Sequence, residues 1–382
     1  MFLSRSPRVA LLALIVALAP AALVAQKKDD KKAQDQQVNA NRHELMPLVR
    51  GTDEVMKGGA AGTWLVSGSE SGQPAPQAQA APGDVPLTWR NDYIKATDNL
   101  IYVPFTVTVE PGRLTGSSLA VYLRVAPKGL TQPHPPAAKK DEKKDDKKAA
   151  GAAAGPTEYP FETFFFTDLK TPAQGLAPRF SRSFAVPAGE YDVYLALRER
   201  AQTAKDNDPP AKVAIIKQTL TIPDFWSTEL TTSSVILADR VDTLTAALAP
   251  EVQAERPYIL GTTEIVPAID DKFKKTEELT VMFFVYGASP DAGTKKPDVK
   301  IEYIFHRREN GAEKKFNETN PILLNATTLP AAFDYAAGHP LVGAQGVPLA
   351  SFPEGDYRLE LKITDNKSGK SLTRDVLFTV TS

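Results

Sequence analysis

The chain has 382 residues, with 45 Lys and Arg against 46 Asp and Glu, so its net charge is −1. This balance excludes the basic surface that a nucleic-acid-binding protein needs to offset phosphate. Cysteine is absent, which excludes disulfides, thiolate metal sites, cysteine nucleophiles and a lipid-modified cysteine.

Residues 1–26 have the layout of a secretory signal peptide. Two arginines precede an apolar run at residues 9–18, and small residues then lead to Ala25. Such a segment is removed on export. A retained anchor is the alternative, but Pro20 interrupts the apolar stretch, which is short for a span of about 20 residues. We therefore expect a periplasmic or extracellular protein with no stable membrane span after cleavage.

Two low-complexity runs flank or interrupt the remaining chain. Residues 27–85 are rich in Lys, Asp, Gly, Ala, Pro, Gln and Ser, which predicts a mostly disordered N-terminal tether. Within it, residues 42–56 favour a short helix and residues 63–66 a stray strand. Residues 132–157 form a second run, in which residues 139–148 carry six Lys against four acids. This composition predicts a charged, disordered insertion whose alternating signs cancel most of its attraction for an anionic polymer.

Between these runs, apolar and polar residues alternate with the period of β-strands. The segments are short, rich in β-branched and aromatic residues, and bounded by Gly, Pro, Asn and Asp. Nine strands are predicted, at residues 101–109, 119–125, 162–166, 191–197, 213–222, 279–286, 299–306, 357–363 and 372–380. Only residues 238–249 favour a longer helix or a structured linker.

An internal repeat organises these strands into two units. Residues 187–191 read Pro-Ala-Gly-Glu-Tyr, and residues 353–357 read Pro-Glu-Gly-Asp-Tyr. Proline ends a strand, glycine adopts a turn conformation, and tyrosine begins the next strand with its hydroxyl free to reach back. This is the tyrosine corner of immunoglobulin-like sandwiches, so we interpret Tyr191 and Tyr357 as structural residues.

The repeat predicts an all-β protein of two tandem immunoglobulin-like (fibronectin-III-like) β-sandwich domains behind a disordered N-terminal tether. Domain 1 covers residues 86–225, including the charged insertion. Residues 226–255 form an interdomain linker, and domain 2 covers residues 256–382. Both units suit a sandwich of about 100 residues once the insertion is removed.

Several short motifs resemble a known group of proteins. The chain is similar to the β-sandwich accessory regions of acidobacterial secreted proteins of the von Willebrand A-related and GWxTD type. The likeness rests on the segments at residues 222–237, 279–286, 353–359 and 373–380. It implies a role in the cell envelope. The A-type domain itself is absent, because the chain has no Asp-x-Ser-x-Ser and no Gly-Trp-x-Thr-Asp motif, so metal-dependent adhesion is not implied.

No segment carries the residues of a catalytic, cofactor-binding or metal site. The pentapeptide at residues 68–72 has Glu at its centre, where a nucleophile elbow needs Ser. No two of the four histidines have the spacing of metal ligands; they are His43, His134, His306 and His339. Residues 365–369 favour a hairpin turn over a calcium loop, because the later bidentate Glu is missing. We expect no cofactor.

Two strands are apolar on both faces, which a half-solvated strand should not be. Residues 164–166 are three successive phenylalanines, and residues 281–286 are all apolar. One face of each fills a sandwich, and the other needs a cover. That cover is the sister domain, a loop or a tether strand, or else a partner protein or a stacked sugar. Phe165 and Phe284 are therefore the candidate interaction surface.

These features favour an exported, non-enzymatic protein-interaction or scaffold protein of the cell envelope, because sandwich faces and edges bind partners without a catalytic constellation. The partner would be an unknown envelope protein and not a nucleic acid. The alternative is a carbohydrate-binding module for an envelope or extracellular polysaccharide. An unrecognised enzyme would instead need clustered carboxylates in a cleft, roughly 5–10 Å apart.

Overall fold

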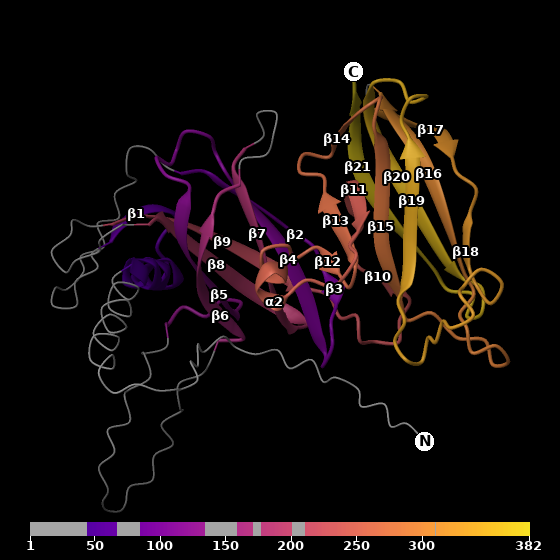
Figure 1. Cartoon of the computed structure of the whole chain (residues 1–382), viewed down its shortest axis with the longest axis horizontal. Helices are drawn as coiled ribbons and strands as arrows, with labels where there is room; N and C mark the ends of the chain where they lie inside the picture. Colours follow the sequence, from indigo (N-terminus) through magenta and orange to yellow (C-terminus); the bar gives the residue numbers. More distant parts are fainter. Residues whose placement is uncertain (1–43, 67–84, 134–158, 171–176, 201–210, 310) are drawn as a thin grey trace, which may run out of the picture.

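The computed structural model describes residues 44–66, 85–133, 159–170, 177–200, 211–309 and 311–382. The expected signal peptide and nearly all of the charged insertion lie outside these ranges. Two β-sandwiches lie side by side, the first in purple and magenta and the second in orange and yellow (Figure 1). None of the described helices is long and apolar enough to cross a bilayer.

The first sandwich consists of sheets A and B. Sheet A has the strand order β1-β9-β8-β5-β6, and sheet B has β4 at its centre, with β2 and β3 on one side and β7 on the other. The strands are β1 (Gly62–Val66), β2 (Leu87–Asn91), β3 (Ile94–Lys95), β4 (Leu100–Val109), β5 (Ser118–Pro127), β6 (Phe161–Asp168), β7 (Arg179–Pro187), β8 (Gly189–Glu199) and β9 (Ala211–Ile222).

The second sandwich consists of sheets C and D. Sheet C has the order β10-β15-β11-β13-β12 with β19 also paired to β15, and sheet D has the order β14-β21-β20-β16-β17 with β18 also paired to β16. The elements are β10 (Thr231–Thr232), β11 (Ile236–Thr243), helix α2 (Pro250–Ala254), β12 (Ile259–Leu260), β13 (Thr263–Pro267), β14 (Lys272–Lys274), β15 (Glu278–Tyr286), β16 (Val299–Glu309), β17 (Ala312–Glu318), β18 (Ile322–Leu324), β19 (Leu341–Pro348), β20 (Gly355–Asp365) and β21 (Ser371–Thr381).

The two sandwiches share one strand arrangement. In the first, β2-β4-β7 face β9-β8-β5-β6, and in the second, β11-β15-β19 face β21-β20-β16-β17. This pairing of a three-strand sheet with a four-strand sheet is that of a small immunoglobulin-like domain. The predicted fold class is therefore confirmed, and each of the nine predicted strands is present.

Two segments that the sequence placed outside the domains belong to them. Within the predicted tether, residues 44–56 are helical and β1 pairs antiparallel with β9. Within the predicted linker, β10 and β11 pair with β15. Of the two alternatives predicted for residues 238–249, a longer helix or a structured linker, the helix is wrong up to Thr243, where β11 ends. Ile236, Leu237 and Ala238 alternate between two apolar layers and so have the period of a strand.

Each sandwich has a tyrosine corner where the chain crosses from one sheet to the other. The Tyr191 hydroxyl donates to the Pro187 carbonyl at 3.2 Å, and the Tyr357 hydroxyl donates to the Pro353 carbonyl at 2.7 Å. Gly355, in the second corner, has φ +139°, a conformation that side chains rarely adopt. Both tyrosines therefore act in the fold as the repeat implies.

A second repeated contact was not apparent from the sequence. A carboxylate follows each corner tyrosine eight residues later on the same strand: Glu199 follows Tyr191, and Asp365 follows Tyr357. Glu199 accepts the backbone N–H of Gly116 at 2.6 Å, and Asp365 accepts that of Ser289 at 2.9 Å. Glu199 thus holds the loop between β4 and β5, and Asp365 holds the loop between β15 and β16, which is at the equivalent place in the second sandwich.

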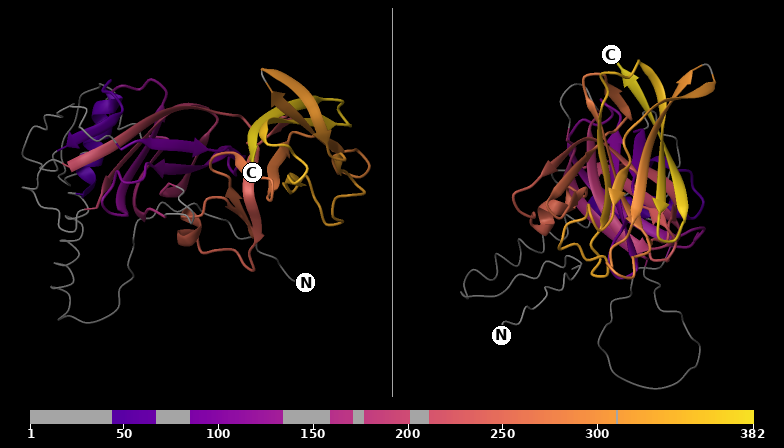
Figure 2. Two further views of the ribbon diagram at one scale, coloured as in Figure 1. Left: turned by 90° about the horizontal axis from the view of Figure 1, so that it is seen from above. Right: turned by 90° about the vertical axis from the view of Figure 1, so that its right-hand side faces the viewer.

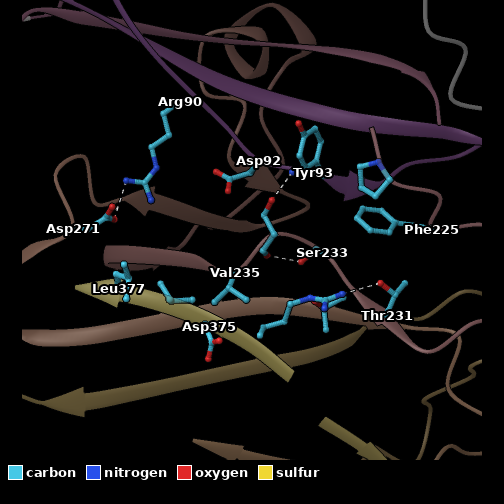
Figure 3. Close-up of a pocket in the computed structure, with 15 residues that line it drawn as sticks. Arg90, Asp92, Tyr93, Phe225, Thr231, Ser233, Val235, Asp271, Asp375 and Leu377 are labelled. Carbon is cyan, nitrogen blue, oxygen red and sulfur yellow. Dashed lines mark hydrogen bonds and ion pairs between the residues drawn. The ribbon is translucent and has the colours of Figure 1, made fainter. Parts of the chain in front are cut away.

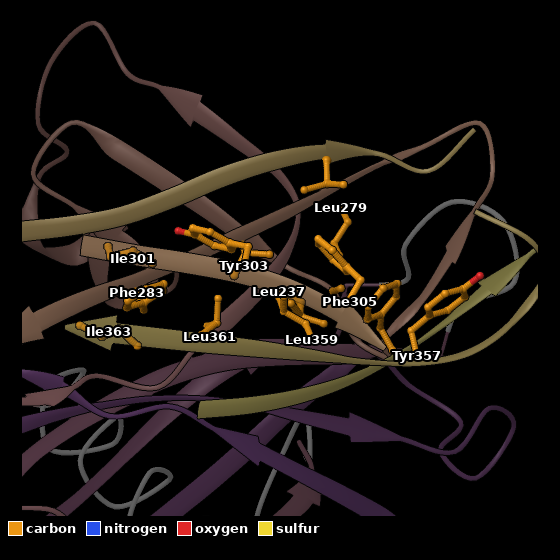
Figure 4. Packing of buried hydrophobic residues seen from close by; sticks show 14 of the residues in the cluster. Leu237, Leu279, Phe283, Ile301, Tyr303, Phe305, Tyr357, Leu359, Leu361 and Ile363 are labelled. Carbon is orange, nitrogen blue, oxygen red and sulfur yellow. The ribbon is translucent and has the colours of Figure 1, made fainter. Parts of the chain in front are cut away.

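Strand β15 shows how one strand serves two apolar layers. Its odd-numbered residues, such as Phe283, enter the core between sheets C and D together with Tyr303, Phe305 and Leu361 (Figure 4). Its even-numbered residues, Met282 and Phe284, face the opposite way and belong to a different cluster. This is the period-2 alternation of a strand with both faces buried.

The second face of sheet A is covered by a strap, residues 44–66, at the end of the molecule away from the second sandwich (Figures 1 and 2). The strap comprises the helix, which covers this face, and β1, which extends the edge of sheet A beside β9. Its apolar side chains pack on the outward residues of β5, β8 and β9, in a cluster of Leu48, Val55, Met56, Trp64, Val66, Ala120, Tyr122, Ala126, Tyr194, Ala196, Val213 and Ile215.

A buried ion pair and a glycine fit the strap to sheet A. The Arg124 side chain on β5 is almost fully buried, and its guanidinium lies 2.6 Å from the Asp53 carboxylate of the helix. Gly51 allows close approach, because a Cβ there would lie 2.8 Å from Ile215. The strap is thus a layer of the first sandwich.

The second face of sheet C is covered by the first sandwich. An apolar cluster joins Ile94 and Tyr102 to residues of the second sandwich, namely Ile236, Ala238, Tyr258, Leu260, Ile265, Met282, Phe284, Tyr286 and Val342. Polar contacts surround it: the Tyr102 hydroxyl donates to the Pro257 carbonyl at 2.8 Å, and the Lys95 N–H donates to the Tyr286 hydroxyl at 3.1 Å. The two sandwiches are therefore docked through an apolar cluster that is surrounded by hydrogen bonds.

Removing a corner hydroxyl should destabilise the protein. We expect Tyr357→Phe to lower the free energy of unfolding by about 1 kcal/mol, the net worth of one hydrogen bond, as measured by urea denaturation. Tyr303→Phe is the matched control, since the Tyr303 hydroxyl is buried without a partner among the described residues, and its loss should be neutral or stabilising. Equal effects of the two changes would contradict the tyrosine-corner assignment.

Phe284 should be needed for stability, whereas Phe164 should not. The Phe284 side chain is 8% exposed at the docking interface, and Phe164 is 56% exposed on the edge strand β6. We expect Phe284→Ser to cost about 3 kcal/mol or more and Phe164→Ser to stay within about 0.5 kcal/mol of the parent protein. Thermal and urea melts of both variants test this, and an unchanged Phe284→Ser protein would show that the sandwiches do not dock in this way.

Candidate functional site

One candidate functional site is a crevice between the two sandwiches. It has a volume of about 500 Å³ and is lined by residues from both (Figure 3). That volume lies in the range of small-ligand and peptide sites, about 300–1,000 Å³. Four segments form it: the end of β2 with the turn after it, residues 223–235, Asp271 before β14, and the middle of β21.

The wall from the first sandwich carries Arg90 and Asp92. Arg90 crosses the crevice and donates to the Asp271 carboxylate at 2.9 Å (Figure 3). Asp92 is 6% exposed and accepts the Tyr258 hydroxyl at 2.8 Å. Burial raises the pKa of Asp92 above its usual 3.8, against the opposing effects of the Tyr258 bond and Arg90.

The wall from the second sandwich carries Arg374 and Asp375 on β21. The Arg374 guanidinium donates to the hydroxyls of Thr232 at 3.1 Å and Thr231 at 3.3 Å. Asp375 points to the outer face of sheet D, where it pairs with Arg358 at 2.5 Å. Arg374 also donates to the Thr373 carbonyl at 3.3 Å, so the hydrogen-bond partners of this cation are uncharged.

The two walls meet where Tyr93 and Ser234 exchange hydrogen bonds. The Tyr93 N–H donates to the Ser234 hydroxyl at 2.9 Å, and the Ser234 N–H donates to the Tyr93 carbonyl at 3.0 Å. Phe225 packs beneath on Tyr286, with 5.0 Å between ring centroids. These contacts join the two sandwiches beside the crevice.

Most of the charged side chains that line the crevice already have partners within the chain. Each of its three carboxylates already has a partner: Asp92 has Tyr258, while Asp271 and Asp375 have arginines. Across the described ranges, no group of three or more His, Asp and Glu side chains is placed to hold a metal ion. What remains available is the Arg374 guanidinium, the neighbouring hydroxyls and the apolar side chains of β21.

The predicted interaction surface does not lie at the crevice or at any exposed face. Phe284 packs against the first sandwich. Phe165 points into the first core, where its ring meets the edge of Phe180 at 6.0 Å and lies beneath Arg182 at 4.6 Å. The chain itself covers both rings, as one of the alternatives for these second faces expected. Contact of Phe165 or Phe284 with a partner stays a prediction.

Sequence reasoning missed the crevice residues altogether. Arg90 and Arg374 lie in segments far apart in the chain; no motif marks Arg90, and the motif at residues 373–380 that contains Arg374 indicated a closing strand and not a site. The available signal was weak: Thr231 to Ser234 are four successive hydroxyl residues in a segment that the sequence placed in a linker. Only docking of the sandwiches brings these groups together.

Comparison with known proteins adds little. No family model matches the chain, and no curated protein matches it. Among solved structures, the chain is similar to Salmonella alpha-2-macroglobulin reacted with methylamine, with 13% identity and a TM-score of 0.20. The match covers 84% of this chain, which spans 18% of that one. A likeness of this size supports no argument about function.

The buried Asp92 carboxylate should make the docked structure less stable as the pH rises. Because its pKa is raised in the folded state, folded Asp92 keeps a proton that the unfolded chain loses above 3.8, so the free energy of unfolding falls across that interval. We expect Asp92→Asn, whose amide oxygen still accepts from Tyr258, to be more stable than the parent at pH 7. Urea denaturation should show this advantage shrinking as the pH falls. A constant advantage at every pH would contradict it.

Proposed function

We propose that this chain is an exported, non-enzymatic protein that binds a partner protein of the cell envelope at the crevice between its two sandwiches. The observation that carries the proposal is the crevice itself, which combines apolar side chains with an arginine that has no carboxylate partner among the described residues. Protein interfaces combine such features, with arginine enriched at their centres.

The cellular address rests on the sequence alone. The signal-peptide pattern of residues 1–26 and the resemblance to acidobacterial secreted proteins both favour a periplasmic or extracellular site. Docked domains support the binding role in a different way. Because the apolar faces of sheets A and C are covered within the chain, the protein presents a defined crevice and not a broad sticky surface.

A cross-linked pull-down tests this proposal. The tagged chain from residue 27 is cross-linked in its native envelope and its partners are identified by mass spectrometry. We expect one reproducible protein partner, whose recovery falls at least about tenfold with Arg374→Glu, since reversing the charge converts attraction into repulsion. Arg308→Glu is the matched control, because Arg308 is exposed on β16 and takes no part in the crevice.

Three results would contradict the proposal. Recovery of no specific protein with the parent chain would remove the interaction role. Recovery of polysaccharide, with saturable binding on a glycan array, would favour the carbohydrate-binding alternative in its place. Equal loss of the partner with Arg374→Glu and Arg308→Glu would place the contact outside the crevice.

A further inference from the structure

One edge of strand β21 is open where it borders the crevice. On one side, β20 pairs with β21 from Ser371 to Val380. On the other side, β14 pairs only with Thr379 to Thr381. Within the described ranges, no strand pairs with the rest of β21 on that side. The residues that border this open edge, 374–377, are also the residues of β21 that line the crevice.

The open edge presents main-chain donors and acceptors. On the side of β14, the Thr379 N–H donates to the Asp271 carbonyl at 3.0 Å and the Thr381 carbonyl accepts the Lys275 N–H at 3.0 Å. The N–H and C=O groups of successive residues point to alternate sides of a strand. Those of Asp375 and Leu377 therefore point to the same side as those of Thr379. The N–H and C=O groups of Asp375 and Leu377 lie beyond the end of β14, beside the crevice. The Leu377 side chain beside them is 53% exposed.

We propose that an extended segment of a partner protein pairs with residues 373–377 as an added strand of sheet D. The added strand lies on the same side of β21 as β14 and continues the edge that β14 covers only in part. This inference rests on the proposed function and specifies how the crevice holds the partner. Addition of a strand to a sheet edge is an established mode of peptide recognition, in which main-chain bonds give affinity and alternate side chains give specificity. Natural sheets normally protect such edges.

The side chains beside the edge define what the segment must contain. Arg374 and Val376 face the inside of the sandwich, and Val235, from the segment between β10 and β11, packs at the same core. Directly opposed side chains of paired strands lie about 5 Å apart. An added strand therefore places one side chain by Arg374 and the side chain two positions away by Val376. The partner segment carries an acidic residue two positions from an aliphatic one.

Hydrogen exchange in the free protein tests whether the edge is open. The N–H groups of Asp375 and Leu377 should exchange rapidly, while those of Val376 and Phe378, which face β20, should be protected at least about a hundredfold, since exchange of a core strand requires opening. Exchange is followed amide by amide by NMR on the full chain from residue 27. Protection of Asp375 and Leu377 in the free protein would show that the edge is already occupied and would overturn the proposal.

A synthetic peptide tests the added strand directly. The probe is Thr-Val-Thr-Glu-Thr-Val-Thr, which presents Val two positions from Glu in either direction of pairing. We expect its addition to protect the amides of Asp375 and Leu377, and replacing its Glu by Gln should weaken binding about tenfold. Of two versions N-methylated on odd or on even residues, one should bind and one should fail. Binding by both, or no binding by the parent peptide, would overturn the proposal.

Two variants of the protein complete the test. Leu377→Pro removes an edge-facing N–H that no strand uses, so the fold should survive while peptide binding falls about tenfold. Arg374→Gln should weaken binding of the parent peptide about as much as replacing the peptide's Glu by Gln does. If the Leu377→Pro protein unfolds, the Arg374→Gln protein still tests the proposal. Arg308→Gln is the control and should bind as the parent does.

The failure of this proposal is distinguishable from failure of the proposed function. If the pull-down recovers a partner that depends on Arg374 but Leu377→Pro recovers it equally well, the crevice binds without strand addition and this inference is overturned. If the peptide binds with the expected dependence on Leu377 and Arg374 while the envelope yields no partner, strand addition stands and the envelope role fails.

Discussion

The architecture depends on the burial of second apolar faces. Sheets A and C are apolar on both sides, and an isolated sandwich would leave about half of those side chains in water. The resulting free-energy gain, about 25 cal/mol per Å² of apolar surface removed from water, is available only if further layers are added. The strap supplies one layer and the neighbouring sandwich supplies the other. A chain without cysteine has no disulfide to replace that stabilisation.

The same requirement generates the crevice. Docking brings Tyr93 against Ser234 and Arg90 against Asp271, and these residues line the crevice beside the apolar centre. Since β14 is only a short strand beside β21, the edge of sheet D is left open at the place where the walls diverge. Binding potential is thus a consequence of how two stable units meet, and neither unit contains it alone.

Local signals in the sequence were sufficient for the strands and the corners. Alternation in β4, β5, β15 and β16 was strong enough to place each strand within a few residues, because the period of 2 is a local property. The tyrosine corner was equally local, since its hydrogen bond spans only four residues, from Tyr357 to Pro353. By contrast, β11 was read as a helix or linker, because its eight residues include Ala, Asp and Arg, which do not favour strands by themselves.

The sequence by itself determined that the chain is an all-β repeat of two sandwiches, and that two strands needed a cover on their second face. It did not determine the cover. An apolar face is satisfied equally well by a strap, a neighbour or a partner, because the hydrophobic effect is non-directional and depends on area alone. Only the tertiary structure assigned Phe284 to the docking interface and Phe166 to the strap, and only it brought Arg90 and Arg374 to one crevice, since non-local contacts leave no periodic trace in the chain.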